Sequence, residues 1–190
     1  MMKRLLLVAF LMIQAGLFAQ KDCDFESNFT DSIGSYKETM QKIMYEKNFG
    51  GNANYIFFSL ASENGVPLLN FQSVQKSKDF MKATCFNQAS KIYIQLENSK
   101  IITLIMAEEG NCGSAVRDEA TGANVRVTSA SFYFMKNAFE DLKKSNVSLI
   151  RIKYATETVD YIIKKEFISE LDARTYAPQN FFIDYLKCVE

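Results

Sequence analysis

Four acidic side chains in one polar segment are the residues whose chemistry stands out first. Glu108, Glu109, Asp118 and Glu119 lie within 108–124, the longest polar connection in the sequence. Carboxylate oxygens are ligands that Ca²⁺ prefers, and two carboxylates flanking a cleft can hydrolyse a glycosidic bond. The spacing matches no known ligand loop, and adjacent acids in a loop are usually solvated. We therefore keep these four as a candidate cation or acid site, with no metal and no catalytic residue assigned.

The residue types that the chain lacks exclude several other kinds of site. It contains no histidine, which removes Ser-His-Asp and Cys-His catalytic groups, histidine-ligated zinc and the commonest general base. It also has no glycine-rich phosphate loop and no Cys-x-x-Cys motif. We therefore expect no cofactor, and the sequence favours a non-enzymatic protein. A secreted hydrolase that uses carboxylates remains an open alternative.

Aromatic residues offer a second kind of candidate site. The chain has 16 Phe and 9 Tyr but no Trp, so Phe must supply most of the bulk of the core. Tyr93 and Tyr133 are candidate exceptions on exposed strand faces, where they could bind a sugar, a peptide or a lipid. A further alternative is a carrier that holds an apolar ligand inside a curved sheet lined by Phe and Tyr.

Residues 1–19 have the organisation of a secretory signal peptide. Lys3 and Arg4 form the charged region, 5–13 is apolar, and Ala19 is a small residue at the expected cleavage point. This apolar stretch is short for a membrane-spanning helix. We therefore expect a mature chain that is exported to the periplasm or the extracellular space, with a bacterial source.

The charge balance of the mature chain bears on its partners. Without Lys3 and Arg4 the chain has 20 basic residues against 22 acidic ones, a net charge near −2. This balance gives no electrostatic reason to expect nucleic acid or an anionic membrane. No later segment is long and apolar enough to span a membrane. The expected partner is a protein or another component of the cell envelope.

A β-hairpin is predicted at the centre of the chain. Its arms are 91–97 and 100–106, joined by Asn98-Ser99, and Asn tolerates the positive φ of a tight turn. The first arm alternates like a half-buried strand, whereas the second is apolar on both faces, as in a strand covered on both sides. Pairing about this turn joins residues whose numbers sum to 197, so that Ile94 faces Thr103.

The four cysteines of the mature chain indicate disulfide bonds, because an even number in an exported chain favours bridges over metal ligation. The hairpin register brings Cys85 opposite Cys112, and we predict a disulfide between them. Cys23 and Cys188 are then left to join the two ends of the domain. This second pairing rests on elimination alone, and a free Cys23 or Cys188 remains an alternative.

Five further strands are predicted outside the central hairpin. They span 54–61, 66–74, 125–134, 147–154 and 159–165. Asn64-Gly65 joins the first two and is a strong hairpin signal, which implies antiparallel pairing. Pro67 removes one donor from its strand, so we expect that strand at a sheet edge.

Three predicted helices complete the domain. The first spans 36–47, with Ser35 as its N-cap and Gly50-Gly51 at its end. The second follows a one-faced apolar pattern over 135–142, and the third begins at Pro178. The expected fold is therefore a single α+β domain over the mature chain. It is mostly an antiparallel sheet of about seven strands, with an N-terminal, a middle and a C-terminal helix.

These features together favour one function over the alternatives. An exported, disulfide-stabilised chain without a catalytic pattern is best explained as a binding or structural domain of the cell envelope. Such a domain would use a sheet face or a sheet edge to bind its partner.

Overall fold

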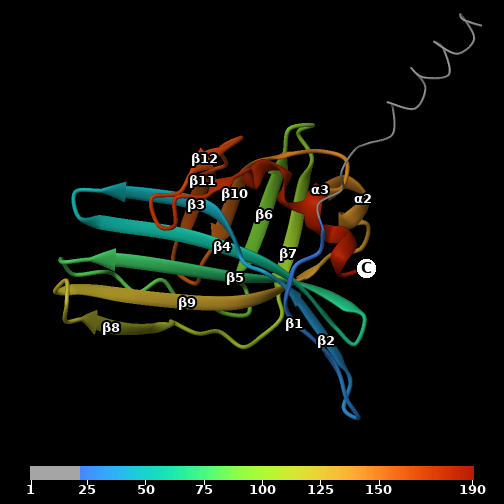
Figure 1. The fold of residues 1–190 in the computed structure, drawn as a ribbon, viewed down its shortest axis with the longest axis horizontal. Coiled ribbons are helices and arrows are strands. Elements are labelled where there is room, and N and C mark those ends of the chain that lie inside the picture. The colour runs from blue at the N-terminus through green and yellow to red at the C-terminus, as the bar shows by residue number, and fades with distance from the viewer. Residues whose placement is uncertain (1–21) are drawn as a thin grey trace, which may run out of the picture.

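The computed structural model describes residues 22–190, so the expected signal peptide at 1–19 lies outside the described residues. Eleven strands form one sheet, and two more form a small separate sheet (Figure 1). Strands account for 52% of the structure and helices for 9%. The expected antiparallel sheet is therefore present, but the expected α+β class with three helices is wrong.

The large sheet consists of two halves, and the long strands of the first half run at a steep angle to the strands of the second (Figure 1). The first half contains, in spatial order, β1 (Phe25–Thr30), β2 (Ser35–Thr39), β4 (Asn52–Glu63), β5 (Val66–Ser77) and β9 (Ala123–Phe134). The second half continues from β9 with β7 (Ile101–Met106), β6 (Lys91–Leu96), β10 (Val147–Lys153) and β11 (Thr158–Ile162). Two strands lie off this path, β3 (Lys42–Phe49) on β4 and β8 (Ser114–Asp118) on β9. The small sheet pairs β12 (Phe167–Ile168) with β13 (Thr175–Tyr176).

The sheet changes direction where β9 passes from one half to the other. Residues Asn124–Tyr133 of β9 pair with β5, whereas only its last three residues, Phe132–Phe134, pair with β7. The two halves therefore enclose a core between their inner faces. Its largest fully buried side chains include Phe58, Phe71, Phe132, Phe181, Phe182, Met44, Ile92 and Ile94.

Phe86, which belongs to no strand, lies at the centre of this core. Its ring centroid is 5.4 Å from that of Phe71 on β5, 5.6 Å from that of Phe132 on β9 and 4.9 Å from that of Tyr154, just after β10. These contacts bridge both halves of the sheet. Aromatic pairs at such distances stabilise a core beyond the area that they bury.

The helices are shorter than expected. The C-terminal segment consists of a 3₁₀ turn (Pro178–Asn180), α3 (Phe181–Tyr185) and a second 3₁₀ turn (Leu186–Cys188). Phe181 and Phe182 are buried against Phe58, so this segment packs its aromatic side chains on the sheet. The middle helix is only α2 (Ala138–Leu142), which begins after the expected start.

The predicted N-terminal helix at 36–47 is wrong, because this segment forms β2 and β3. A register irregularity between Ile43 and Tyr45 leaves both Ile43 and Met44 buried. This irregularity breaks the alternation of a strand and produces apolar spacing that resembles a helix. Gly50-Gly51, with φ of +58° and +81°, is the hairpin turn between β3 and β4 rather than a helix end.

The Asn64-Gly65 hairpin is confirmed as the turn between β4 and β5. However, the edge position predicted for the strand of Pro67 is wrong, since β5 pairs with β4 on one side and β9 on the other. Pairing with β9 begins only at Leu68, so the missing N–H of Pro67 lies beyond that ladder. The predicted long loop also contains an additional strand, β8.

The central hairpin is confirmed as β6 and β7, but its predicted register is wrong by one residue. Ile94 faces Ile102, because the loop contains three residues and Ser99 takes a φ of +68°. A one-residue shift moves every side chain to the other face. Consequently Ile102 and Leu104 point into the core, whereas Ile101 and Ile105 are 63% and 40% exposed. The second arm is therefore covered on one face only.

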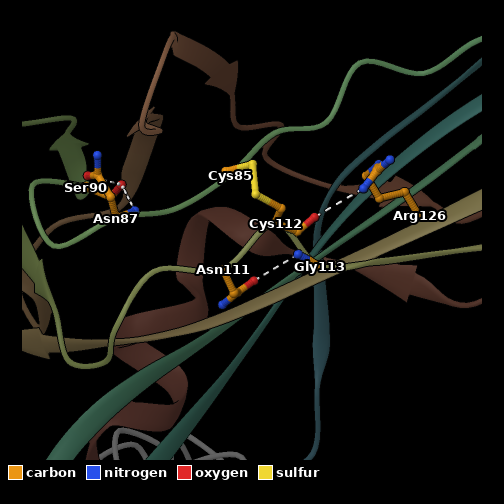
Figure 2. Close-up of a disulfide and its surroundings, with 7 residues drawn as sticks. All are labelled: Cys85, Asn87, Ser90, Asn111, Cys112, Gly113 and Arg126. Carbon is orange, nitrogen blue, oxygen red and sulfur yellow. Dashed lines mark hydrogen bonds between the residues drawn. A yellow bond between two sulfur atoms is a disulfide. The ribbon is translucent and has the colours of Figure 1, made fainter.

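Both predicted disulfides are present, Cys23–Cys188 between the two ends of the described chain and Cys85–Cys112 between two loops (Figure 2). The second bridge lies outside β6 and β7. Next to it, the amide of Phe86 donates a hydrogen bond of 2.7 Å to the carbonyl of Asn111. The bridge and this bond together hold Phe86 in the core.

Hydrogen bonds hold the Cys112 side of this bridge next to β9. The Nδ2 of Asn111 donates to the carbonyl of Ser129 at 2.9 Å. Arg126 donates to the carbonyl of Cys112 at 3.2 Å, as Figure 2 shows. Gly113 follows with a φ of +64° and lies so close to β9 that a Cβ would overlap the carbonyl oxygen of Val127. Only glycine fits this backbone position without displacement.

A pair of glycine substitutions tests this close approach. Gly122 also has a positive φ, +66°, but a Cβ there would meet only Arg117 Nη2 at 3.9 Å. Gly122→Ala should therefore cost only the left-handed strain of about 1–2 kcal/mol. Gly113→Ala should cost about 1–3 kcal/mol more, because backbone must move. If chemical denaturation showed the same loss of unfolding free energy in both variants, the close contact between Gly113 and β9 would be contradicted.

The contribution of each disulfide to the free energy of unfolding can be measured by replacing both of its cysteines with serine. Loop entropy alone predicts a loss of about 5 kcal/mol without Cys23–Cys188 and about 3–4 kcal/mol without Cys85–Cys112. We expect the opposite order in the free energy of unfolding, because loss of Cys85–Cys112 also releases Phe86 from the core. A ranking that follows loop length would show that the bridge does not position Phe86.

Candidate functional site

The outer face of the second half of the sheet is the first candidate site, and we call it the Tyr93 face. It consists of the outward-pointing residues of β7, β6, β10 and β11. These are Ile101, Thr103, Ile105, Lys91, Tyr93, Gln95, Leu149, Arg151, Lys153, Thr158, Asp160 and Ile162. Because Ile92 and Ile94 point into the core, strand alternation turns Tyr93 and Gln95 outward.

Cross-strand pairing arranges this face in rows. One row is mainly apolar and crosses four strands as Ile162, Leu149, Gln95 and Ile101. The next row contains Tyr93 between Arg151 and Thr103. In a third row Ile105 pairs with Tyr133 of β9, so both tyrosines predicted from the sequence lie on the same outer side of the sheet. They occupy different rows and are not direct neighbours.

The charges of the Tyr93 face fall into two groups. Arg151 makes a two-bond pair with Asp160, at 2.6 Å from Nε and 2.7 Å from Nη2. This pair raises the pKa of Arg151 and lowers that of Asp160 through the shared hydrogen bonds. Lys91 and Lys153 lie directly opposite each other, and neither has an ion pair within residues 22–190. Facing like charges are unfavourable, so this pair would gain from an anionic partner.

A groove of about 620 Å³ lies on the Tyr93 face, and its lining includes Tyr93, Ile101, Leu149, Arg151 and Lys153. Its apolar margin is exposed, as Ile101 and the neighbouring Ile162, which is 74% exposed, illustrate. Exposed apolar groups beside Tyr and Arg are typical of protein-binding surfaces. The groove can therefore accept apolar side chains and carboxylates together.

A hydrogen-bonded cluster around Glu38 is the second candidate site, on the outer face of the first half. Its carboxylate accepts from the Tyr36 hydroxyl at 2.7 Å, from Ser59 at 2.6 Å and from Asn70 at 2.8 Å. Ser131 in turn donates to Asn70 at 2.8 Å. Burial, followed by the hydrogen bond and charge of Glu38, raises the pKa of Tyr36 to about 12. The cluster is a preorganised polar network.

This cluster was not predicted, because its residues come from four strands far apart in the sequence. One signal in the sequence could have indicated it: polar residues occupy every second position of two strands, as at Asn70 and Gln72 and at Ser129 and Ser131. The network borders a groove of about 320 Å³ that Glu63 and Glu108 also line. Glu108 is thus the one loop acid that lies beside another candidate site.

The four predicted loop acids do not share one site. Glu109 lines a different shallow pocket with Asn87 and Gly110. Asp118 pairs with Lys76 at 3.1 Å and accepts a hydrogen bond of 2.5 Å from the Thr121 hydroxyl. Glu119 is exposed. Within residues 22–190 no group of three or more Asp, Glu, Cys or His is arranged to hold a metal ion.

Asp118 offers a titration test of its structural role. Its hydrogen bonds to Thr121 and Lys76 lower its pKa to about 2, so the charged form that they stabilise persists above pH 4 and is lost as the pH falls through about 2. We expect its carboxyl carbon to titrate near pH 2 by NMR and higher in Lys76→Gln and Thr121→Val variants. A midpoint near the ordinary value of about 3.9 would contradict these contacts.

Comparisons with known proteins add no further assignment. No protein-family model, no curated protein and no solved structure matches this chain. Across the described part of the chain, none of the helices is long and apolar enough to cross a membrane. The functional inference therefore rests on the geometry of the sites above.

Proposed function

We propose that this protein is an exported, non-enzymatic binding domain of the bacterial cell envelope that engages a partner protein through the Tyr93 face. The two disulfides support an oxidising, exported environment, since such bonds persist outside the cytosol. The partner carries acidic and apolar side chains on the surface that meets the groove.

The observation that carries this proposal is the exposure of two isoleucines on the outer face of the central hairpin. Its inner face buries Ile92, Ile94 and Leu104, as the core requires. Its outer face nevertheless keeps Ile101 and Ile105 in solvent, where polar residues would serve folding equally well. The unpaired lysines at 91 and 153 set the expected charge of the partner.

The groove beside Glu38 favours a second candidate function, a carboxylate-based hydrolase. Glu38, Glu63 and Glu108 line this groove, which would supply the pair of acids that such an enzyme needs. However, the carboxylate of Glu38 already accepts hydrogen bonds from Tyr36, Ser59 and Asn70, which suits a structural role better than proton transfer. We therefore rank the hydrolase below the binding domain.

The structure offers no support for the third candidate, a carrier of an apolar ligand. The space between the two halves of the sheet is occupied by the rings of Phe58, Phe71, Phe86 and Phe132 together with those of α3. A dense aromatic core of this kind is the interior of a closed domain.

Site-specific photo-crosslinking in the envelope of the source cell tests the binding domain. A crosslinking residue at Ile101 or Ile162 should give an adduct of discrete mass, with the partner identified by mass spectrometry. A crosslinker at Ile168 serves as the matched control, because it is 70% exposed but lies on the separate sheet of β12. The adduct should weaken at least about tenfold when Lys91 and Lys153 are both changed to Glu, since attraction becomes repulsion.

Two results would contradict the proposal. One is equal crosslinking from the Tyr93 face and from Ile168, which would indicate random encounters. The other is an adduct that is insensitive to the double charge reversal, which would show that the partner is not acidic.

A further inference from the structure

A separate pocket forms where the first long strand of the sheet is interrupted, and we call it the strand-break pocket. Between β2 and β3 the chain leaves the ladder at Met40 and Gln41. The amide of Met40 donates instead to the carbonyl of Asp24 at 3.0 Å. The resulting pocket, about 350 Å³, lies between this break, residues 174–178 and α3. Its volume falls in the range of small-molecule sites.

The pocket has an apolar floor and aromatic walls. Ile43 and Phe181, each only 2% exposed, line it together with the buried Pro178. The half-buried rings of Tyr176 and Tyr185 stand beside this floor. Such a lining favours a flat, apolar ligand body.

Two basic side chains line the same pocket. The ammonium of Lys42 lies 5.3 Å from the centroid of the Tyr185 ring. The Nε of Arg174 is 3.9 Å from Asp172, beyond hydrogen-bond distance, and Asp172 already accepts a bond of 2.7 Å from the Tyr176 hydroxyl. Among the described residues that line the pocket, Asp24 is the only acidic one. Lys42 and Arg174 nevertheless place two cationic groups at the rim, and these can meet an anionic group on the ligand.

The wall that carries Arg174 and Tyr176 is fixed to the main sheet. Glu46 on β3 accepts a hydrogen bond of 2.5 Å from the hydroxyl of Ser169 and one of 2.9 Å from the amide of Glu170. These bonds anchor the β12–β13 hairpin next to β3. The pocket is therefore formed before any ligand arrives, which favours binding.

We propose that the strand-break pocket binds a small organic carboxylate with a flat apolar body. The body lies on Ile43 and Phe181 between the two tyrosines, and the carboxylate meets Lys42 and Arg174 at the rim. Arg suits this role because its guanidinium can donate two parallel hydrogen bonds to one carboxylate. The pocket is distinct from the Tyr93 face, so this proposal stands or fails independently of the proposed partner.

Benzoate and benzamide form a matched pair of probes, because they share a ring and differ in the charged group. We expect benzoate, titrated into the ¹⁵N-labelled domain with both disulfides intact, to shift the amide signals of Ile43, Arg174 and Tyr176 with a millimolar Kd. Benzamide should bind at least about fivefold more weakly, since it cannot pair with the two cations. Absence of benzoate shifts at the pocket, or equal binding of benzamide, would overturn the proposal.

Variants of the rim give the second test. The double change Lys42→Gln and Arg174→Gln should weaken benzoate binding about tenfold or more. Lys164→Gln is the matched control, because Lys164 also lies over an aromatic ring, 5.7 Å from the centroid of Phe167, but does not line the pocket. Unchanged benzoate affinity in the double variant, or an equal loss in the Lys164 control, would show that the rim cations do not hold the ligand.

Discussion

The packing of Phe86 between the two halves of the sheet is the contact on which the rest of the structure depends. Phe86 lies in a loop, yet its ring touches Phe71, Phe132 and Tyr154, which belong to opposite sides of the core. A loop residue leaves a core readily unless its backbone is held. The adjacent Cys85–Cys112 bridge and the hydrogen bond from Phe86 to Asn111 provide that restraint. This disulfide therefore positions a core residue as well as closing a loop.

Side chains fill the interior and two disulfides hold it together. Function is therefore expected on the outer surfaces. The Tyr93 face is built on strands whose inner residues are fully buried, so its side chains project from a rigid frame. The strand-break pocket has the same support, because Glu46 fixes one wall and the Cys23–Cys188 bridge lies next to Asp24. Both sites are therefore held in place by neighbouring elements of the fold.

The acidic residues show how context decides the role of a carboxylate. Asp118 caps its own turn and pairs with Lys76, and Glu38 accepts three hydrogen bonds from neighbouring strands. Glu46 anchors the small sheet through Ser169 and Glu170. In each case the carboxylate accepts hydrogen bonds that fix local structure, within a turn at Asp118 and between strands or sheets at Glu38 and Glu46. The loop acids were predicted as a group because they lie close together in the sequence. Glu38 and Glu46, which join separate strands or sheets, lie within strands instead.

The sequence by itself determined the features that depend on short-range chemistry. Asn64-Gly65 marked a hairpin because its backbone accepts positive φ, and the alternation at 92–96 marked a half-buried strand. Both cysteine pairs were also predicted, one from the hairpin geometry and one by elimination. Tertiary structure alone decided that 36–47 pairs as strands, that Ile94 faces Ile102, and that the Glu38 cluster and the strand-break pocket exist. The physical reason is that a strand is completed by partners distant in sequence, so a bulge or a single extra loop residue changes which side chains face the core and which meet solvent.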